Sequence, residues 1–247
     1  PIIFNAADVV EQSIPLKKGW SWISTNITHN APDVLTQMKN SLLDVGVLIK
    51  GRSTYIQQPG WVGTLNVVSE KSMYVINTNI DHNLILKGTN ATPESTTIDI
   101  TNGWNWISYV PNFSTSLKNA LAGLNATVGD QIKAQSGYAS YTGANGWIGS
   151  LTFMQPGKGY MYYSANNTTH NFVYPSSLSQ RVNALRAKQE SQNRWQANES
   201  KFAGSMTITA IVIHSDAEIR SDQIELAAFS GNECRGTVML QYVESLD

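Results

Sequence analysis

The sequence predicts a mainly β protein: two tandem antiparallel-sheet modules, each with one helix, followed by part of a β-sandwich. Three observations predict this fold class. A tryptophan-marked segment occurs twice, with the same landmarks after it. Short stretches of alternating apolar and polar residues lie between turns rich in Gly and Asn. Charged residues make up only 14% of the chain, against about 25% in an average globular protein, a composition common in β-rich extracellular proteins.

The repeat begins with Gly-Trp-x-Trp-Ile-Ser, which occurs at residues 19–24 and again 84 residues later, at 103–108. Five further landmarks follow in the same order, at offsets that grow from 83 to 88 residues. They pair Val47–Lys50 with Gln131–Lys133, Tyr55 with Tyr138, Gly60–Leu65 with Gly146–Leu151, Lys71–Ile76 with Lys158–Tyr163, and His82–Leu86 with His170–Tyr174. Small insertions in turns produce such a drift, so we interpret the pattern as a duplication.

Each copy has the same expected elements. Residues 13–28 alternate as strands do, and a helix is expected over 32–43 in the first copy and 116–124 in the second. Asn30 is a candidate N-cap of the first helix. Further strands are expected near 47–50, 53–57, 61–67, 72–77 and 83–87, and at the matching positions of the second copy.

These patterns predict five parts. Residues 1–12 resemble the end of a preceding module, 13–90 form module 1, and 91–175 form module 2. A polar, partly helical linker is expected over 176–201. Residues 202–247 have strand patterns at 206–213, 224–229 and 234–243. Because so few residues do not easily bury a core alone, we expect an incomplete β-domain within a larger multidomain chain.

Composition excludes several classes of function. The net charge is −1, so no basic field attracts nucleic acid. No apolar stretch approaches the roughly 18 residues that a membrane-spanning helix needs. Cys234 is the only cysteine, which rules out an internal disulfide or a cysteine-based zinc site. No nucleophile elbow, phosphate loop or dinucleotide motif is present. We therefore expect neither an enzyme nor a cofactor.

The same landmarks resemble modules that repeat in large surface and secreted proteins of Bacteroidetes. The resemblance rests on Gly-Trp-x-Trp-Ile-Ser, on Gly146–Leu151, and on Pro156-Gly-Lys-Gly-Tyr-Met161. It extends to the Met-Thr-Ile-Thr-Ala-x-Val and Ala-Ala-Phe-x-Gly-x-Glu-Cys-Arg-Gly patterns at residues 206–212 and 227–236. Module 1 departs from it at residues 68–71, where Pro-Gly is missing before Lys71. The resemblance implies export, an extracellular or outer-membrane surface location, and adhesion or glycan-related roles.

Tryptophans are the leading candidates for a binding role. Two-residue spacing places Trp20 with Trp22, and Trp104 with Trp106, on one face of a strand. We interpret these pairs, with Gly19 and Gly103, as a structural signature whose rings lie mainly in the core. Trp61 and Trp147 lie in Gly-flanked turns, and two interpretations stay open for them. They pack in the core or between modules, or they form exposed platforms for a sugar ring, with Tyr55 and Tyr138 beside them.

Weaker candidates concern metals and reactive side chains. His82 and His170 are repeat equivalents, expected to support the fold at a strand edge rather than bind a ligand. Cys234 is expected to be structural. Asp216, Glu218, Asp222 and Glu225 form an acidic group that either surrounds a solvated turn or offers oxygen ligands to calcium.

Two hypotheses about function follow. The chain is a non-catalytic surface module that binds a polysaccharide or a surface protein, or it is an architectural spacer that displays another domain. Repetition favours both, because repeats give multivalent binding and also give length.

Overall fold

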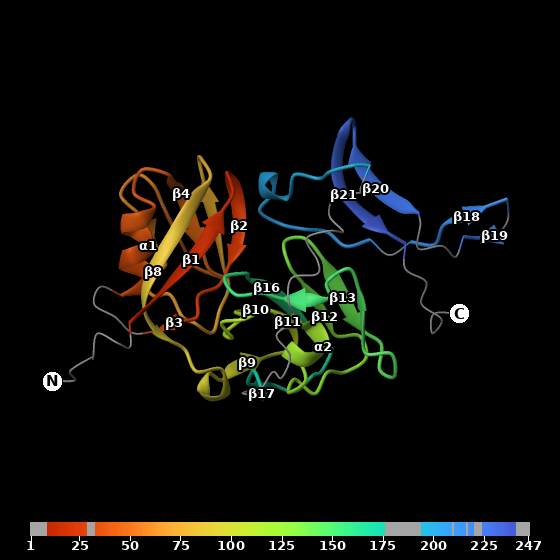
Figure 1. Ribbon diagram of the computed structural model, residues 1–247, viewed down its shortest axis with the longest axis horizontal. Coiled ribbons are helices and arrows are strands. Elements are labelled where there is room, and N and C mark those ends of the chain that lie inside the picture. Colours follow the sequence, from red (N-terminus) through yellow and green to blue (C-terminus); the bar gives the residue numbers. More distant parts are fainter. Residues whose placement is uncertain are drawn as a thin grey trace.

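The computed structural model describes residues 9–28, 33–175, 194–208, 210–215, 217–219 and 224–240. The described part is mainly β and consists of several antiparallel sheets with two short helices. Module 1, red to yellow in Figure 1, lies beside module 2 in green, and a C-terminal unit in blue follows. Residues 1–8 of the expected N-terminal segment and residues 176–193 of the expected linker lie outside the described residues, while residues 10–12 belong to the first strand of module 1.

Module 1 combines a five-stranded sheet, a three-stranded sheet and helix α1. The five-stranded sheet has the order β2-β7-β4-β5-β6, and the three-stranded sheet has the order β1-β8-β3. The strands are β1 (Val10–Leu16), β2 (Gly19–Ile23), β3 (Ile27–Thr28), β4 (Gly46–Lys50), β5 (Tyr55–Gln57), β6 (Val62–Gly63), β7 (Tyr74–Thr78) and β8 (His82–Asn90). Helix α1 (Val34–Ser41) packs against β8.

Module 2 repeats the five-stranded sheet and the helix, but has two two-stranded sheets in place of the three-stranded one. Its five-stranded sheet has the order β10-β16-β12-β13-β14, which matches module 1 strand for strand. The strands are β9 (Ile98–Ile100), β10 (Gly103–Ile107), β11 (Thr115–Ser116), β12 (Gln131–Lys133), β13 (Tyr138–Tyr141), β14 (Trp147–Gly149), β15 (Phe153–Met154), β16 (Tyr160–Ser164) and β17 (His170–Phe172). β9 pairs with β17 and β11 with β15. A 3-10 turn, η2 (Pro93–Ser95), precedes β9.

Both expected helices form, but each is shorter than its apolar pattern suggested. Asp33, not Asn30, is the N-cap of α1, because its side chain accepts the Thr36 N–H. Helix α2 (Leu117–Ala120) is one turn long, and Ser116 caps it through the Asn119 N–H. Beyond the C-cap of α2, Leu124 is buried in the turn that follows, whereas Leu43, just beyond the C-cap of α1, is exposed.

The strand register corrects one landmark of the repeat. The prediction pairs Lys71 with Lys158, an offset of 87 residues. Trp22 lies opposite Val75, and its counterpart Trp106 lies opposite Met161, so the equivalent strands are offset by 86. Tyr74 and Tyr160 are therefore equivalent, and each hydroxyl accepts a backbone N–H five residues upstream, at Ser69 and Gln155. Identical lysines had obscured this one-residue shift.

The C-terminal unit differs most from the prediction. A strand was expected over 206–213, but only Ile213–His214 forms a ladder there, as β18 with β19 (Ala217–Glu218). The apolar side chains of Met206, Ile208 and Ile211 are exposed. A strand pattern needs a neighbouring strand to satisfy its backbone groups, and none pairs with 206–212 among the described residues. Strands β20 (Glu225–Ser230) and β21 (Glu233–Met239) form a hairpin close to the expected ranges.

Each module has its own apolar core. Ile14, Ile23, Ile49, Ile76 and Leu84 belong to the core of module 1, where α1 adds Val34, Leu35 and Met38. The core of module 2 contains four buried tyrosines and Phe172. Burial raises the pKa of Tyr109, Tyr160, Tyr162 and Tyr174, so these hydroxyls stay neutral and donate or accept hydrogen bonds. Neither helix in the described part of the chain has the length and apolar character needed to cross a bilayer.

Candidate functional site

The outer face of each five-stranded sheet, opposite the module core, carries most of the repeated signature residues. Because side chains alternate along a strand, Ile23 and Ile107 point into the cores and the tryptophans point to the other side. The strand register lines up Trp22, Val75, Lys50 and Tyr55 in module 1, and Trp106, Met161, Lys133 and Tyr138 in module 2. The repeated Lys and Tyr therefore belong to the same row as the repeated Trp.

The tryptophan pairs are predicted to lie mainly in the core, and of their four rings only Trp22 is buried. Trp22 is buried, but it belongs to a separate cluster with Met73 and Val75. Trp20, Trp106 and Met161 pack against that cluster while staying partly exposed. Trp22 comes from module 1 and Trp106 from module 2, so these two tryptophans pack between the modules. The physical reason is parity: once Ile23 occupies the core side, its neighbour Trp22 cannot.

Backbone hydrogen bonds join the two modules in a reciprocal pattern. Ser24 N–H donates to the Gly157 carbonyl at 3.2 Å, and Ser108 N–H donates to the Lys71 carbonyl at 3.3 Å. Ser24 is equivalent to Ser108, and the corrected register makes Lys71 equivalent to Gly157. A further bond runs from Gly159 N–H to the Trp22 carbonyl at 3.2 Å. The interface is thus close to the isologous type of a symmetric dimer, here within one chain.

One side chain breaks that symmetry. Ser24 Oγ donates to the Lys158 carbonyl at 2.7 Å and accepts Tyr109 N–H at 3.0 Å, so it bridges the modules. Its counterpart Ser108 is fully buried, yet its Oγ has no hydrogen-bond partner among the described residues. The Ser108 carbonyl is held instead by the Tyr174 hydroxyl at 2.6 Å.

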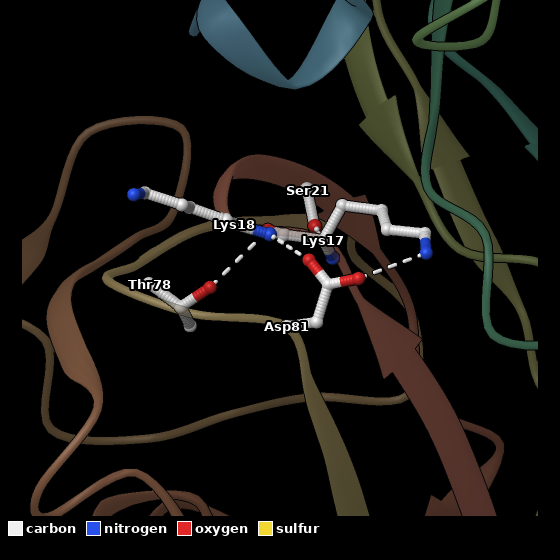
Figure 2. A network of polar contacts seen from close by, with 5 residues as sticks. All are labelled: Lys17, Lys18, Ser21, Thr78 and Asp81. Atoms are coloured by element: carbon white, nitrogen blue, oxygen red, sulfur yellow. Dashed lines mark hydrogen bonds and ion pairs between the residues drawn. The ribbon is translucent and has the colours of Figure 1, made fainter.

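The turn before β2 is held by a polar network, shown in Figure 2. Asp81 accepts Lys18 N–H at 2.8 Å and pairs with Lys17 Nζ at 2.9 Å. The Lys18 N–H, followed by the Lys17 ammonium, lowers the pKa of the Asp81 carboxyl. Ser21 Oγ accepts Lys17 N–H, and Thr78 donates to the Lys17 carbonyl.

Module 2 preserves the turn with different side chains. Asn105 stands where module 1 has Ser21, and its Oδ1 accepts Thr101 N–H at 3.0 Å. Thr101 is the equivalent of Lys17, so both modules bond the same backbone group before the signature strand. The sequence difference therefore leaves the local geometry intact, which explains why both Gly19 and Gly103 keep a positive φ, 96° and 83°.

A covering segment, residues 198–203, lies against β2 of module 1. It contains the 3-10 turn η3 (Glu199–Lys201). The Trp22 indole Nε1 donates to the Ala203 carbonyl at 3.0 Å. A Cβ built on Gly19 would lie 2.2 Å from the Ser200 carbonyl oxygen, so backbone meets backbone at this point. Sequence reasoning placed 198–201 in a linker and missed this contact, because nothing in the local pattern indicates a distant partner.

Gln135 of module 2 completes the contact. Its Oε1 accepts Trp22 N–H at 2.9 Å, and its Nε2 donates to the Trp20 carbonyl at 2.8 Å. The same Nε2 also reaches the Glu199 carbonyl at 3.3 Å. One side chain amide thereby satisfies the free edge of β2 and connects both modules to the covering segment.

The outer face of module 2 is lined by polar and aromatic groups. Lys133 Nζ lies 4.8 Å from the centroid of the Trp104 ring, within the range of a cation–π contact. Partial burial lowers the pKa of Lys133. Tyr163 meets Trp104 edge-to-face, with ring centroids 5.3 Å apart. All three side chains stay partly exposed.

Trp61 and Trp147 do not lie beside the tyrosines that were proposed as their companions. Both rings are half-buried and pack against the cores of their modules. Trp61 Nε1 is buried without a partner among the described residues, and its ring lies against Gly46. Trp147 meets Tyr141 and Tyr162. These positions agree with the packing interpretation, although each ring keeps some exposed surface.

Tyr55 and Tyr138 lie on the outer faces, away from those rings. Tyr55 is 45% exposed, while Tyr138 is half-buried and its hydroxyl pairs with Ser140. Opposite faces of the sheet separate Tyr55 from Trp61 and Tyr138 from Trp147. The structure therefore does not assemble either predicted tryptophan–tyrosine pair.

The two candidate histidines and Cys234 each lie within hydrogen-bonding distance of another group of the fold. His82 shares a 3.1 Å hydrogen bond with Ser41, and His170 lies 3.4 Å from the Thr168 carbonyl. Cys234 is a free, half-buried thiol beside the Gly236 carbonyl. Asp216 and Asp222 lie outside the described residues, and Glu218 is exposed. Within the described ranges, no group of His, Cys, Asp or Glu is arranged to hold a metal ion.

Two faces thus stand out as candidate sites: the covered outer face of module 1 and the partly exposed outer face of module 2. Comparison of the chain with protein-family models, with curated proteins and with solved structures found no match.

Proposed function

We propose that this chain is a non-catalytic, architectural part of an exported surface protein, in which two repeat modules form a stiff spacer. The observation that carries the proposal is the reciprocal junction. Backbone bonds at Ser24 and Ser108, together with the tryptophan cluster between the modules, tie each module to the other at several points. A flexible pair of domains needs none of these contacts.

Composition and motif support the rest of the proposal. The low share of charged residues and the resemblance to repeated surface modules both favour export to an extracellular or outer-membrane location. The signature residues lie at the junction between the modules, in the turns before β2 and β10, and on the outer faces of the two five-stranded sheets. A spacer needs repeated residues that hold its neighbouring modules together.

The stiffness of the junction tests the proposal. Leu43 and Val128 are 62% and 67% exposed and lie in different modules, so both accept a spin label after replacement by Cys in a Cys234→Ser background. Pulsed dipolar spectroscopy is expected to give one narrow distance distribution. A Trp22→Ala control, which removes the cluster ring, is expected to broaden it. A broad distribution in the unaltered junction would contradict the spacer role.

Glycan binding is the second candidate, and one observation favours it. Trp147 keeps partly exposed ring surface beside Tyr141, with centroids 5.3 Å apart, and flat aromatic surface suits the apolar face of a sugar. A polysaccharide array compared between the protein and its Trp147→Ala variant tests this candidate. Binding that Trp147→Ala abolishes, with the fold retained, would favour it over the purely architectural role, and absence of binding to any polysaccharide would remove it.

A further inference from the structure

We infer that the outer face of module 2, at Gly103 and Trp106, is a docking site for an extended polypeptide segment of a partner protein. The covering segment shows what such a face binds. On module 1, a short stretch of main chain lies over Gly19 and accepts the Trp22 indole N–H through the Ala203 carbonyl. The contact is made by backbone and small residues, with Ser200, Ala203 and Gly204 at or next to the contact points.

Module 2 presents the same groups at the same positions. Gly103 has the positive φ of Gly19, and Trp106 lies at the position of Trp22 in the equivalent strand. A Cβ built on Gly103 has no heavy atom of the described residues within 4 Å, whereas on Gly19 it meets Ser200. None of the described residues therefore fills at Gly103 the space that the covering segment fills at Gly19.

The donor that anchors the segment is also available. The Trp106 side chain is partly exposed, and its Nε1 has no hydrogen-bond partner among the described residues. An indole N–H is a donor only, so it selects a carbonyl or another acceptor. Gly103 admits main chain at close range, because no side chain stands in the way. Together they favour a peptide carbonyl flanked by small side chains, in an extended stretch.

The partner is a different polypeptide rather than a second copy of this chain. In this structure the segment 198–203 is already bound within its own chain, to Trp22 of module 1 and Gln135 of module 2. A second copy would have to release those bonds before its segment could bind module 2 elsewhere. A partner that presents a free extended segment binds without that cost.

The probe is a synthetic peptide with the sequence of residues 196–205, added to the full chain carrying ¹⁵N-labelled tryptophan. The seven tryptophans give one indole N–H signal each, assigned by single Trp→Phe substitutions. Saturable movement of the Trp106 signal is expected, with a Kd on the order of 1 mM for so short a peptide, while the Trp22 signal stays in place. A scrambled peptide and one with Ala203→Trp are expected to bind at least fivefold more weakly, and neither change can disturb the protein fold.

The matched protein variants are Trp106→Phe, which keeps a ring in the cluster but removes the N–H donor, and Trp195→Phe in the C-terminal unit. The first is expected to weaken peptide binding at least fivefold and the second to leave it unchanged. Three results would overturn the proposal: no movement of the Trp106 signal at several millimolar peptide, movement of the Trp22 signal alone, or equal binding of the scrambled peptide. Sedimentation that reveals a dimer without added peptide, lost in Trp106→Phe, would assign the face to a second copy instead.

Discussion

Two serines at equivalent positions of the repeat have different surroundings. Ser24 Oγ makes two hydrogen bonds across the module junction, and Ser108 Oγ makes none with the described residues. The repeat alone makes these serines indistinguishable. The contacts at the junction decide which hydroxyl is bonded, because Tyr109 N–H and the Lys158 carbonyl both lie within hydrogen-bonding distance of Ser24 Oγ.

This difference gives a matched pair of substitutions. Ser24→Ala removes the partner of the buried Tyr109 N–H and of the partly buried Lys158 carbonyl, which is expected to lower the free energy of unfolding by about 1–3 kcal/mol. Ser108→Ala removes a hydroxyl that bonds none of the described residues, and the expected change is within about 0.5 kcal/mol. Urea denaturation monitored by tryptophan fluorescence measures both. Equal losses in the two variants would contradict the structural assignment.

Asp81 gives the protein an acid-sensitive contact. Its pKa is lowered from the ordinary 3.8, first by the Lys18 N–H and then by Lys17. A carboxyl with a lowered pKa in the folded state contributes stability that is present above its unfolded pKa and is lost as pH falls through the folded value. We therefore expect the stability difference between the protein and Asp81→Asn to be present at pH 7 and to shrink below about pH 4.

Denaturation curves at a series of pH values measure this difference. High salt is the control, because screening weakens the exposed Lys17 pair while the bond from Lys18 N–H stays. A difference between protein and variant that does not change with pH would show that Asp81 acts without its charge.

At the level of elements, the two hairpins β5–β6 and β13–β14 share a close backbone approach. Gly63 has φ 150° and Gly149 has φ 149°. A Cβ on either would lie 2.1 Å from a carbonyl oxygen, that of Tyr55 in one module and that of Tyr138 in the other. The second position of the repeated Gly-Trp-x-Gly pattern therefore needs glycine for two reasons: a Cβ would collide with the neighbouring backbone, and the φ angle is unfavourable for other residues.

Substitution of these glycines tests the explanation. Gly149→Ala is expected to lower the free energy of unfolding by more than about 2 kcal/mol, because backbone must move to admit the methyl group. Gly204→Ala is the control, since a Cβ there meets none of the described residues within 4 Å and its φ needs no glycine. Thermal unfolding followed by circular dichroism compares the two. A Gly149→Ala protein as stable as the control would refute the close approach.

On the scale of the whole molecule, the tryptophan cluster couples the modules. Trp22 is 4% exposed and contacts groups of both modules and the covering segment. We expect the two modules to unfold in one calorimetric transition. Trp22→Ala is expected to cost about 3–5 kcal/mol and to separate that transition into two, whereas Trp195→Ala, in the C-terminal unit, leaves it single. Two transitions in the unaltered protein would contradict the coupling.

Much of the fold could be predicted from the sequence. The duplication, most strand positions of both modules and the position of each helix follow from periodicity and from repeated landmarks, because core-facing residues such as Ile23 and Ile107 recur with the strand period. The strand expected at 61–67 is the exception, since only Val62–Gly63 forms a strand there. Predictions failed where pairing partners were needed. Residues 206–212 have a strong strand pattern, yet among the described residues no strand pairs with them.

For the candidate site, too, the sequence could not predict contacts between distant segments. The sequence by itself determined which residues repeat, including Trp22, Lys50 and Tyr55 and their counterparts. The register of neighbouring strands decided that these residues line one outer face, and packing between modules decided that Trp22 is buried there. Only the tertiary structure placed residues 198–203 on that face, because a contact between residues some 180 positions apart leaves no periodic trace in the chain. Local pattern fixes which face a side chain takes, and long-range packing decides what covers that face.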